Sequence, residues 1–191
     1  RKLLSELDRN ARQTDVEIAK KIGVSKQVVN YRIQRLLSQG IITDFYTLVN
    51  LSSLGIQSYY VFIQLENINK ERERLLLERL KKLDYIGWLV SGTGRWDVVL
   101  LVYSPSTLEF ARMLDEIVSL CGNHLHEHMF TTLIESEHIS YKFLTDSARS
   151  FSHLKRNKDL PKSLDQKDEK ILQTIAHNAR ASIVEIAGKI K

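Results

Sequence analysis

The chain has 191 residues, of which 43% are hydrophobic and 27% are charged, a composition that excludes a mostly disordered protein. Its longest apolar run, residues 98–103, is far shorter than the roughly 20 residues that cross a bilayer, and no signal peptide pattern opens the chain, so we expect a cytoplasmic protein. The net charge of +5 is uneven: residues 1–54 carry nine basic and five acidic side chains, residues 55–144 nine and twelve, and residues 145–191 ten and six. Two basic ends suit contact with a polyanion, and ordinary solvated charge is the alternative.

Three short helices are predicted in residues 1–39, because apolar residues recur there every three or four positions. They are Leu3, Leu4 and Leu7, then Val16, Ile18, Ala19 and Ile22, then Val29, Ile33, Leu36 and Leu37. Thr14 and Glu17 have the spacing of a capping box, and Ser25 is the expected cap of the third helix. Gly23 permits a sharp turn between the second and third helices, so the pattern is typical of a helix-turn-helix. Residues 40–49 are expected to form a short wing or connecting strand.

The outward face of the third helix is rich in hydrogen-bond donors that reach base edges or phosphates in a major groove. We expect the DNA-binding residues to be Ser25, Lys26, Gln27, Asn30, Tyr31, Arg32 and Arg35, with Gln34 on the same face. The alternative is an ordinary solvated helix face.

Residues 55–144 follow the order strand, helix, strand, strand, helix, strand, which is that of a ferredoxin-like domain. Strands are expected at 58–65, 86–93, 96–103 and 124–134, with a further one at 138–144, and helices at 70–83 and 106–120. Their buried stripes are expected to be Leu76, Leu80 and Leu83 in the first helix and Phe110, Leu114, Ile117 and Cys121 in the second. Cys121 is the single cysteine, which excludes an intramolecular disulfide and a cysteine-based zinc cluster.

The third strand, residues 98–103, is apolar on both faces, yet two helices cover only one face of a four-stranded sheet. A wet apolar face forfeits several kcal/mol at roughly 25 cal/mol per Å² and invites aggregation. We therefore expect two sheets to pack face to face in a homodimer. Cover by the N-terminal module of the same chain is the alternative.

An internal repeat appears when the chain is shifted by 168 positions. Asn10-Ala11-Arg12 then falls on Asn178-Ala179-Arg180, and Val16-Glu17-Ile18-Ala19 on Val184-Glu185-Ile186-Ala187. The second copy opens at residues 164–169, where Asp168 and Glu169 suit a helix N-terminus. Both ends of the chain fall inside the same module, so we expect a piece of a longer tandem protein.

The resulting class is α+β, with four segments. They are a winged helix-turn-helix at 1–54, a ferredoxin-like domain at 55–144, a basic linker at 145–163, and the start of a second helix-turn-helix at 164–191. The domain at 55–144 is expected to dimerise.

Several motifs together resemble the Lrp/AsnC family of transcription regulators. They are LDxxDxxIL at the start of the second copy, the two NAR triplets, GVS followed by VxxRI at 29–33, LxxxGII at 36–42, and GTGRWD at 92–97. The resemblance covers almost the whole chain, and its tandem form is similar to an archaeal-type architecture. It implies DNA binding by dimers, which often assemble into tetramers or octamers, and a small-molecule effector, commonly an amino acid, held between adjacent dimers. The resemblance also implies that the domain at 55–144 senses this ligand.

For such an effector, we expect Gly92 and Gly94 to leave backbone NH groups accessible, Asp97 to accept from an α-ammonium group, and Trp96 to form an apolar wall. Thr131 and Thr132 are expected as polar partners on the last strand. The alternative is a tight hairpin in which Asp97 bonds its own turn.

A metal site and catalysis are the remaining alternatives. His124, His126 and His128 alternate on a predicted strand, but their spacing of nearly 7 Å is long for one tetrahedral ion, so we expect no metal. Siroheme decarboxylases resemble the same two-domain layout and are the competing enzyme class. Residues 94–97 differ from that family's Tyr-Asn-x-Trp string, and no nucleophile and base stand at a recognisable spacing. We therefore expect neither catalytic residues nor a cofactor.

Overall fold

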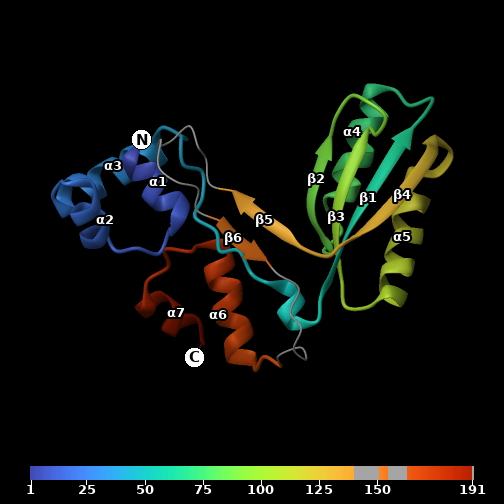
Figure 1. Cartoon of the computed structure of the whole chain (residues 1–191). Helices are drawn as coiled ribbons and strands as arrows, with labels where there is room; N and C mark the ends of the chain where they lie inside the picture. The colour runs from blue at the N-terminus through green and yellow to red at the C-terminus, as the bar shows by residue number, and fades with distance from the viewer. Residues whose placement is uncertain (140–150, 155–162, 191) are drawn as a thin grey trace. The chain divides into compact units, whose positions relative to one another are not determined.

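A computed structural model describes residues 1–139, 151–154 and 163–190 of the chain. The chain folds as two compact units (Figure 1). One unit comprises residues 1–49 together with the described parts of 137–154 and 163–191, and the other comprises residues 50–136. The two units are described separately below.

The N-terminal unit begins with three helices, α1 (Lys2–Arg9), α2 (Asp15–Ile22) and α3 (Lys26–Ser38). Leu3 and Leu7 of α1, Ile18 and Ala19 of α2, and Val29 and Ile33 of α3 form one buried cluster. The predicted helices and their periodic apolar stripes are therefore confirmed. Val16 is an exception, because its side chain is 44% exposed instead of buried.

Residues 43–50 carry no strand, so the expected wing or connecting strand is absent from this described segment. A strand needs a neighbour to complete its backbone hydrogen bonds. Here the carbonyl of Phe45 accepts instead from the backbone NH of Ala179, at 2.7 Å, and the Phe45 ring packs against the helical cluster. A short 3-10 helix, η1 (Leu51–Leu54), follows in the second unit.

The second unit is a four-stranded sheet with two helices. Its elements are β1 (Gln57–Leu65), α4 (Lys70–Leu80), β2 (Ile86–Ser91), β3 (Val98–Ser104), α5 (Thr107–Cys121), the 3-10 helix η2 (Gly122–His124) and β4 (Leu125–Leu133). The strand order is β2-β3-β1-β4, with antiparallel pairing between neighbours. This is the predicted ferredoxin-like βαββαβ topology, and the strands lie side by side in Figure 1.

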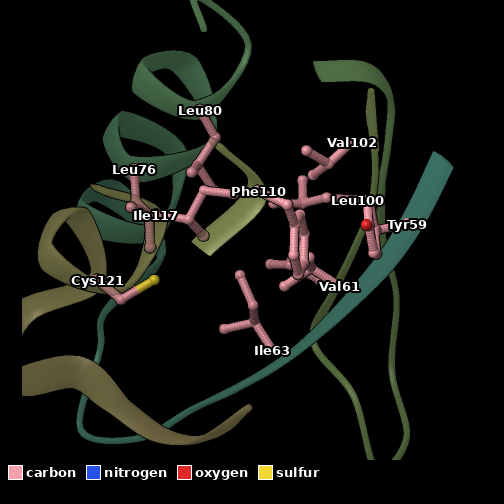
Figure 2. Close-up of a cluster of buried hydrophobic side chains, with 11 residues drawn as sticks. Tyr59, Val61, Ile63, Leu76, Leu80, Leu100, Val102, Phe110, Ile117 and Cys121 are labelled. Atoms are coloured by element: carbon pink, nitrogen blue, oxygen red, sulfur yellow. The ribbon is translucent and has the colours of Figure 1, made fainter. Parts of the chain in front are cut away.

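One face of the sheet packs against α4 and α5 (Figure 2). Every second residue of the two central strands faces this core. Val61 of β1 and Val98, Leu100 and Val102 of β3 are therefore fully buried. The helices contribute Leu76, Leu80, Phe110, Ile117 and Cys121. The expectation that Cys121 packs in a core is confirmed.

The opposite face of the sheet is also apolar. Residues that alternate with the core positions line it, including Tyr60, Phe62, Val99, Leu101, Trp88 and Val90. Trp88 is 47% exposed and Val90 is 39% exposed. This outer face has the composition of a surface that needs a cover.

The remaining described segments belong to the first unit. They are β5 (Ser136–Ile139), β6 (Phe151–Leu154), α6 (Gln166–His177) and α7 (Ile183–Ile190), and β5 pairs with β6. Strand β6 lies within the segment predicted as a basic linker, where the sequence shows no sign of a strand. Of the strand expected at 138–144, the structure describes only residues 138 and 139, which belong to β5. Of the rest of the predicted linker, it describes only residue 163.

The helices of the repeat have matching bounds. The bounds of α7 are those of α2 shifted by 168 residues, and α1 and α6 end at equivalent positions. The residues after them fold alike too, because the Asn10 and Asn178 side chains accept from Arg12 N at 2.9 Å and Arg180 N at 3.0 Å. The sequence repeat is therefore a structural repeat. Within the described residues, no helix is long and apolar enough to cross a membrane.

We predict that Leu80→Ala lowers the free energy of unfolding of the second unit by about 2–5 kcal/mol, because it leaves a cavity beneath the sheet. Urea unfolding followed by tryptophan fluorescence measures this directly, since Trp88 and Trp96, the only two tryptophans, both lie in that unit. The matched control is Leu75→Ala on the same helix, where the side chain is 47% exposed. Equal losses from both substitutions would contradict the packing described here.

Candidate nucleic-acid interface

Local hydrogen bonds fix the turn that joins α2 to α3. The Thr14 hydroxyl accepts from Glu17 N at 3.2 Å, and the Glu17 carboxylate accepts from Thr14 N at 2.7 Å, so the predicted capping box is confirmed. The Thr14 backbone NH and hydroxyl both donate to the Glu17 carboxylate, which lowers the pKa of Glu17. Gly23 ends α2 in the left-handed region at φ +72°, and the Ser25 hydroxyl caps α3 by accepting from Val28 N. The chain therefore reverses within three residues and begins α3 at a defined position.

Buried side chains hold α3 against α2. Ile18 and Val29 are fully buried, and Ile33 is almost so. Their burial leaves the opposite side of α3 to solvent, where the predicted DNA-binding residues are all exposed. Tyr31 is 65% exposed although it is aromatic. Exposed aromatic and donor-rich side chains on one helical face suit contact with bases and backbone.

Six of the seven predicted residues divide between two shallow hollows, and the seventh, Ser25, caps α3. The first is lined by Lys26, Gln27, Asn30, Tyr31 and Gln34. The second contains Arg32 and Arg35 together with Arg1 and Lys2 of the N-terminus and α1. Sequence reasoning missed Arg1 and Lys2, because periodicity does not show which helix end lies beside α3.

The cations of α3 are available to an anionic ligand. Among the described residues, no carboxylate lies within ion-pair distance of Lys26, Arg32 or Arg35. Asn30 differs, because its Nδ2 donates to Asp15 Oδ2 at 3.2 Å, which orients the amide at the edge of the first hollow. The surface therefore combines free positive charges with one positioned amide.

Comparison with known proteins agrees with this geometry. A family model described as winged helix-turn-helix DNA-binding matches residues 1–43. The HTH-type transcriptional regulator Ptr1 of Methanocaldococcus jannaschii is 32% identical over 115 residues, which are 60% of this chain and 76% of Ptr1. LrpA of Pyrococcus horikoshii is 27% identical over 59% of this chain and 78% of LrpA. The chain belongs to the Lrp/AsnC family of transcriptional regulators.

Solved structures of Lrp/AsnC proteins share the fold. An AsnC family regulator from Agrobacterium tumefaciens superposes with a TM-score of 0.64 at 18% identity, covering 71% of this chain and 88% of that one. A transcriptional regulator from Neisseria meningitidis, solved as a complex with L-Met, gives a TM-score of 0.62 at 20% identity, covering 69% and 85%. These solved structures show that the chain has the fold of the family.

The turn proposed to sense an effector in this Lrp/AsnC chain lies between β2 and β3. Asp97 Oδ2 accepts from Leu65 N at 2.7 Å, and Asp97 N donates to Ile63 O at 2.9 Å. Gly92 N donates to Asp97 O, and Gly94 adopts φ +153°, which L side chains rarely adopt. Asp97 therefore ties the turn to β1, a tertiary contact that neither sequence alternative named.

Trp96 packs beside Phe62, with ring centroids 5.8 Å apart, and the Arg95 guanidinium lies 5.0 Å from the Trp96 ring centroid. Thr131 and Thr132 are elsewhere, since they pair with Tyr60 and Tyr59 on β4. They are three to four residues along the sheet from the turn, about 10–13 Å, and point to opposite faces. Within one protomer the structure does not bring these threonines to the turn.

The three histidines do not share one strand face. His124 lies in η2, whereas His126 and His128 are on β4. His124 Nδ1 is 3.3 Å from the Glu66 carbonyl, and His126 Nδ1 is 3.3 Å from the Glu66 carboxylate. In the described part of the chain, no group of three His, Cys, Asp or Glu residues could hold a metal ion.

Other titratable groups of the second unit are shifted by their surroundings. Burial raises the pKa of the Cys121 thiol to about 11 and, with the nearby Tyr60, raises the pKa of Tyr103. Burial and a hydrogen bond to Glu116 raise the pKa of Tyr85. All three groups are therefore protonated at neutral pH.

We predict that Asp97→Ala lowers the stability of the second unit by about 1–3 kcal/mol, because Leu65 N loses its acceptor. Urea unfolding followed by tryptophan fluorescence measures the loss. The matched control is Asp115→Ala, at an exposed position of α5. A variant as stable as the control would show that Asp97 does not fix the turn.

Proposed function

We propose that this Lrp/AsnC regulator places α3 in the major groove of its DNA. The observation that carries the proposal is the uncovered polar face of α3, on which Lys26, Arg32 and Arg35 have no carboxylate partner among the described residues. Ser25, Lys26, Gln27, Asn30 and Tyr31 would contact bases and nearby phosphates, and Arg32 and Arg35 would contact the backbone. Arg1 and Lys2 would add phosphate contacts beside them.

The outer face of the sheet is proposed to pair with the same face of a second chain. Its Tyr60, Phe62 and Leu101 are apolar or aromatic and alternate with core residues, so a hydrophobic cover stabilises it. Isologous pairing of identical faces closes a dimer. Such dimers would carry two copies of α3 for two half-sites, and tetramers or octamers would be built from them.

An amino acid or a related small molecule is the proposed effector. The Neisseria regulator bound to L-Met supports this idea for a protein of the same fold. Here the Gly92–Asp97 turn, with Gly94 and Trp96, would form one side of the pocket. Since Thr131 and Thr132 lie away from that turn, they would serve the same effector only from another protomer.

We infer a regulatory and not an enzymatic role, which the names of the relatives support. No observation favours the siroheme decarboxylase alternative. In this proposal residues 1–54 bind DNA, residues 55–144 sense the effector and dimerise, residues 145–163 link, and residues 164–191 begin the second helix-turn-helix. A chain that acts on genomic DNA would work in the cytoplasm.

Salt titration of DNA binding tests the proposed interface. We predict that Lys26→Ala and Arg35→Ala each weaken binding to the DNA upstream of the protein's own gene by about tenfold and reduce the salt slope by about one per lost phosphate contact. Fluorescence anisotropy of a labelled duplex between low and moderate salt measures both quantities.

The matched controls are Lys82→Ala and Arg74→Ala, which remove the same charges from exposed positions of the second unit. They are expected to leave affinity within about twofold, because neither side chain belongs to the proposed interface. If the α3 variants bind as tightly as these controls, α3 does not enter the groove.

Leu101→Glu is predicted to convert the dimer to monomers, because it puts a charge in the centre of an apolar interface. Light scattering after size-exclusion chromatography gives the mass of both proteins. Leu75→Glu, on an exposed position of α4, is the control and should remain dimeric. An unchanged mass for Leu101→Glu would favour cover by the N-terminal module of the same chain.

A further inference from the structure

The two NAR triplets form the same turn in two places. In each copy the asparagine side chain holds the backbone NH of the arginine, and the following residue donates to the asparagine carbonyl: Gln13 N to Asn10 O and Ala181 N to Asn178 O. The turn is therefore a rigid unit whose arginine points in a fixed direction. The two arginines point at each other's copy.

The contacts between the copies are reciprocal. Arg12 Nη1 donates to the carbonyl of Ala179 at 2.8 Å, and Arg180 Nη1 donates to the carbonyl of Ala11 at 2.8 Å. Because residues 12 and 180 are equivalent, as are residues 11 and 179, each copy uses the same donor and acceptor. This exchange is the mark of an isologous interface, formed here within one chain.

The interface is packed as well as hydrogen-bonded. Ala179 and Ala181 are 2% and 3% exposed, and their small side chains permit close approach of the two turns. Thr47 Oγ1 donates to Ile175 O at 2.8 Å, which adds a contact from the segment after α3. The second copy of the repeat is therefore held at several points between Ala11 and Thr47.

A one-sided ion pair makes the interface selective. Arg180 Nη2 lies 2.6 Å from Asp15 Oδ1, Arg180 Nη1 also donates to Gln13 O at 3.0 Å, and both side chains of the pair are mostly buried. The position equivalent to Asp15 in the second copy is Ile183, so the reverse pair is not formed. Asp15 also accepts from Asn30, which connects the docked copy to α3 while the outward face of that helix stays exposed.

We propose that the NAR turn is a homotypic docking surface, and that its occupant is the second copy of the repeat in the same chain. Pairing in cis places the two described helices of the second copy, α6 and α7, against the first helix-turn-helix without a second chain. It also keeps the carboxylate of Asp15 neutralised beside the DNA-facing residue Asn30. A phosphate backbone approaching α3 then meets no unpaired negative charge at this point.

Charge reversal in the full chain tests the proposal. Arg180→Asp and Asp15→Arg should each speed amide hydrogen exchange in α6 and α7 by about tenfold or more, because each puts like charges face to face. The double variant restores an opposite charge pair but not the hydrogen bonds that Arg180 donates to Ala11 O and Gln13 O, so exchange should be about threefold slower than in either single variant. Exchange should not change when the protein is diluted a hundredfold. Arg112→Asp, in the other unit, is the control that leaves α6 and α7 unchanged.

Three results would overturn the proposal. The first is an Arg180→Asp variant in which amide exchange of α6 and α7 is unchanged. The second is a double variant whose α6 and α7 exchange as fast as in the single variants. The third is a loss of protection in α6 and α7 on dilution, which would show that the pairing joins different chains. The readout needs no DNA, so it stands or falls separately from the DNA-binding proposal.

Discussion

The contact of Ile18 with Val29 and Ile33 is the interaction on which the position of α3 depends. These three side chains are almost completely removed from water, and they join α2 to α3 across a turn of three residues. Burying the apolar side of α3 leaves the polar side outside. The exposure of Lys26, Asn30 and Tyr31 is therefore a consequence of core packing and not a separate feature.

The same principle acts in the second unit with a different outcome. Successive side chains of β1 and β3 point to opposite faces, and in these strands both sets are apolar. The helices α4 and α5 cover one set, and the other set lines the outer face of the sheet. The regulator thus has one helix whose outward face is polar and suits DNA, and one sheet whose outward face is apolar and suits another chain.

Local features of the sequence were sufficient to predict much of this. Capping by Thr14 and Ser25 and the turn at Gly23 depend on residues three or four positions apart, so their outcome could be inferred from spacing. The four strands and the topology of the second unit also followed from alternation. Val16 was wrongly assigned to the core, because periodicity gives a stripe but not its width.

Features set by contacts between distant segments could not be predicted. The partner of Asp97 is Leu65, 32 residues away, and it depends on the register of β1. The repeat was visible in the sequence, but the reciprocal bonds of Arg12 and Arg180 were not, because similarity does not show that two copies touch. The strand at residues 151–154 likewise exists only through pairing with β5.

Site-specific photo-crosslinking tests the central claim most directly. A photoreactive phenylalanine analogue at position 31, on the outward face of α3, is compared with the same residue at position 108 on α5; both native side chains are about two-thirds exposed. The account predicts that position 31 crosslinks to bases of a bound duplex and position 108 does not. Crosslinking from position 108 and none from position 31 would contradict it.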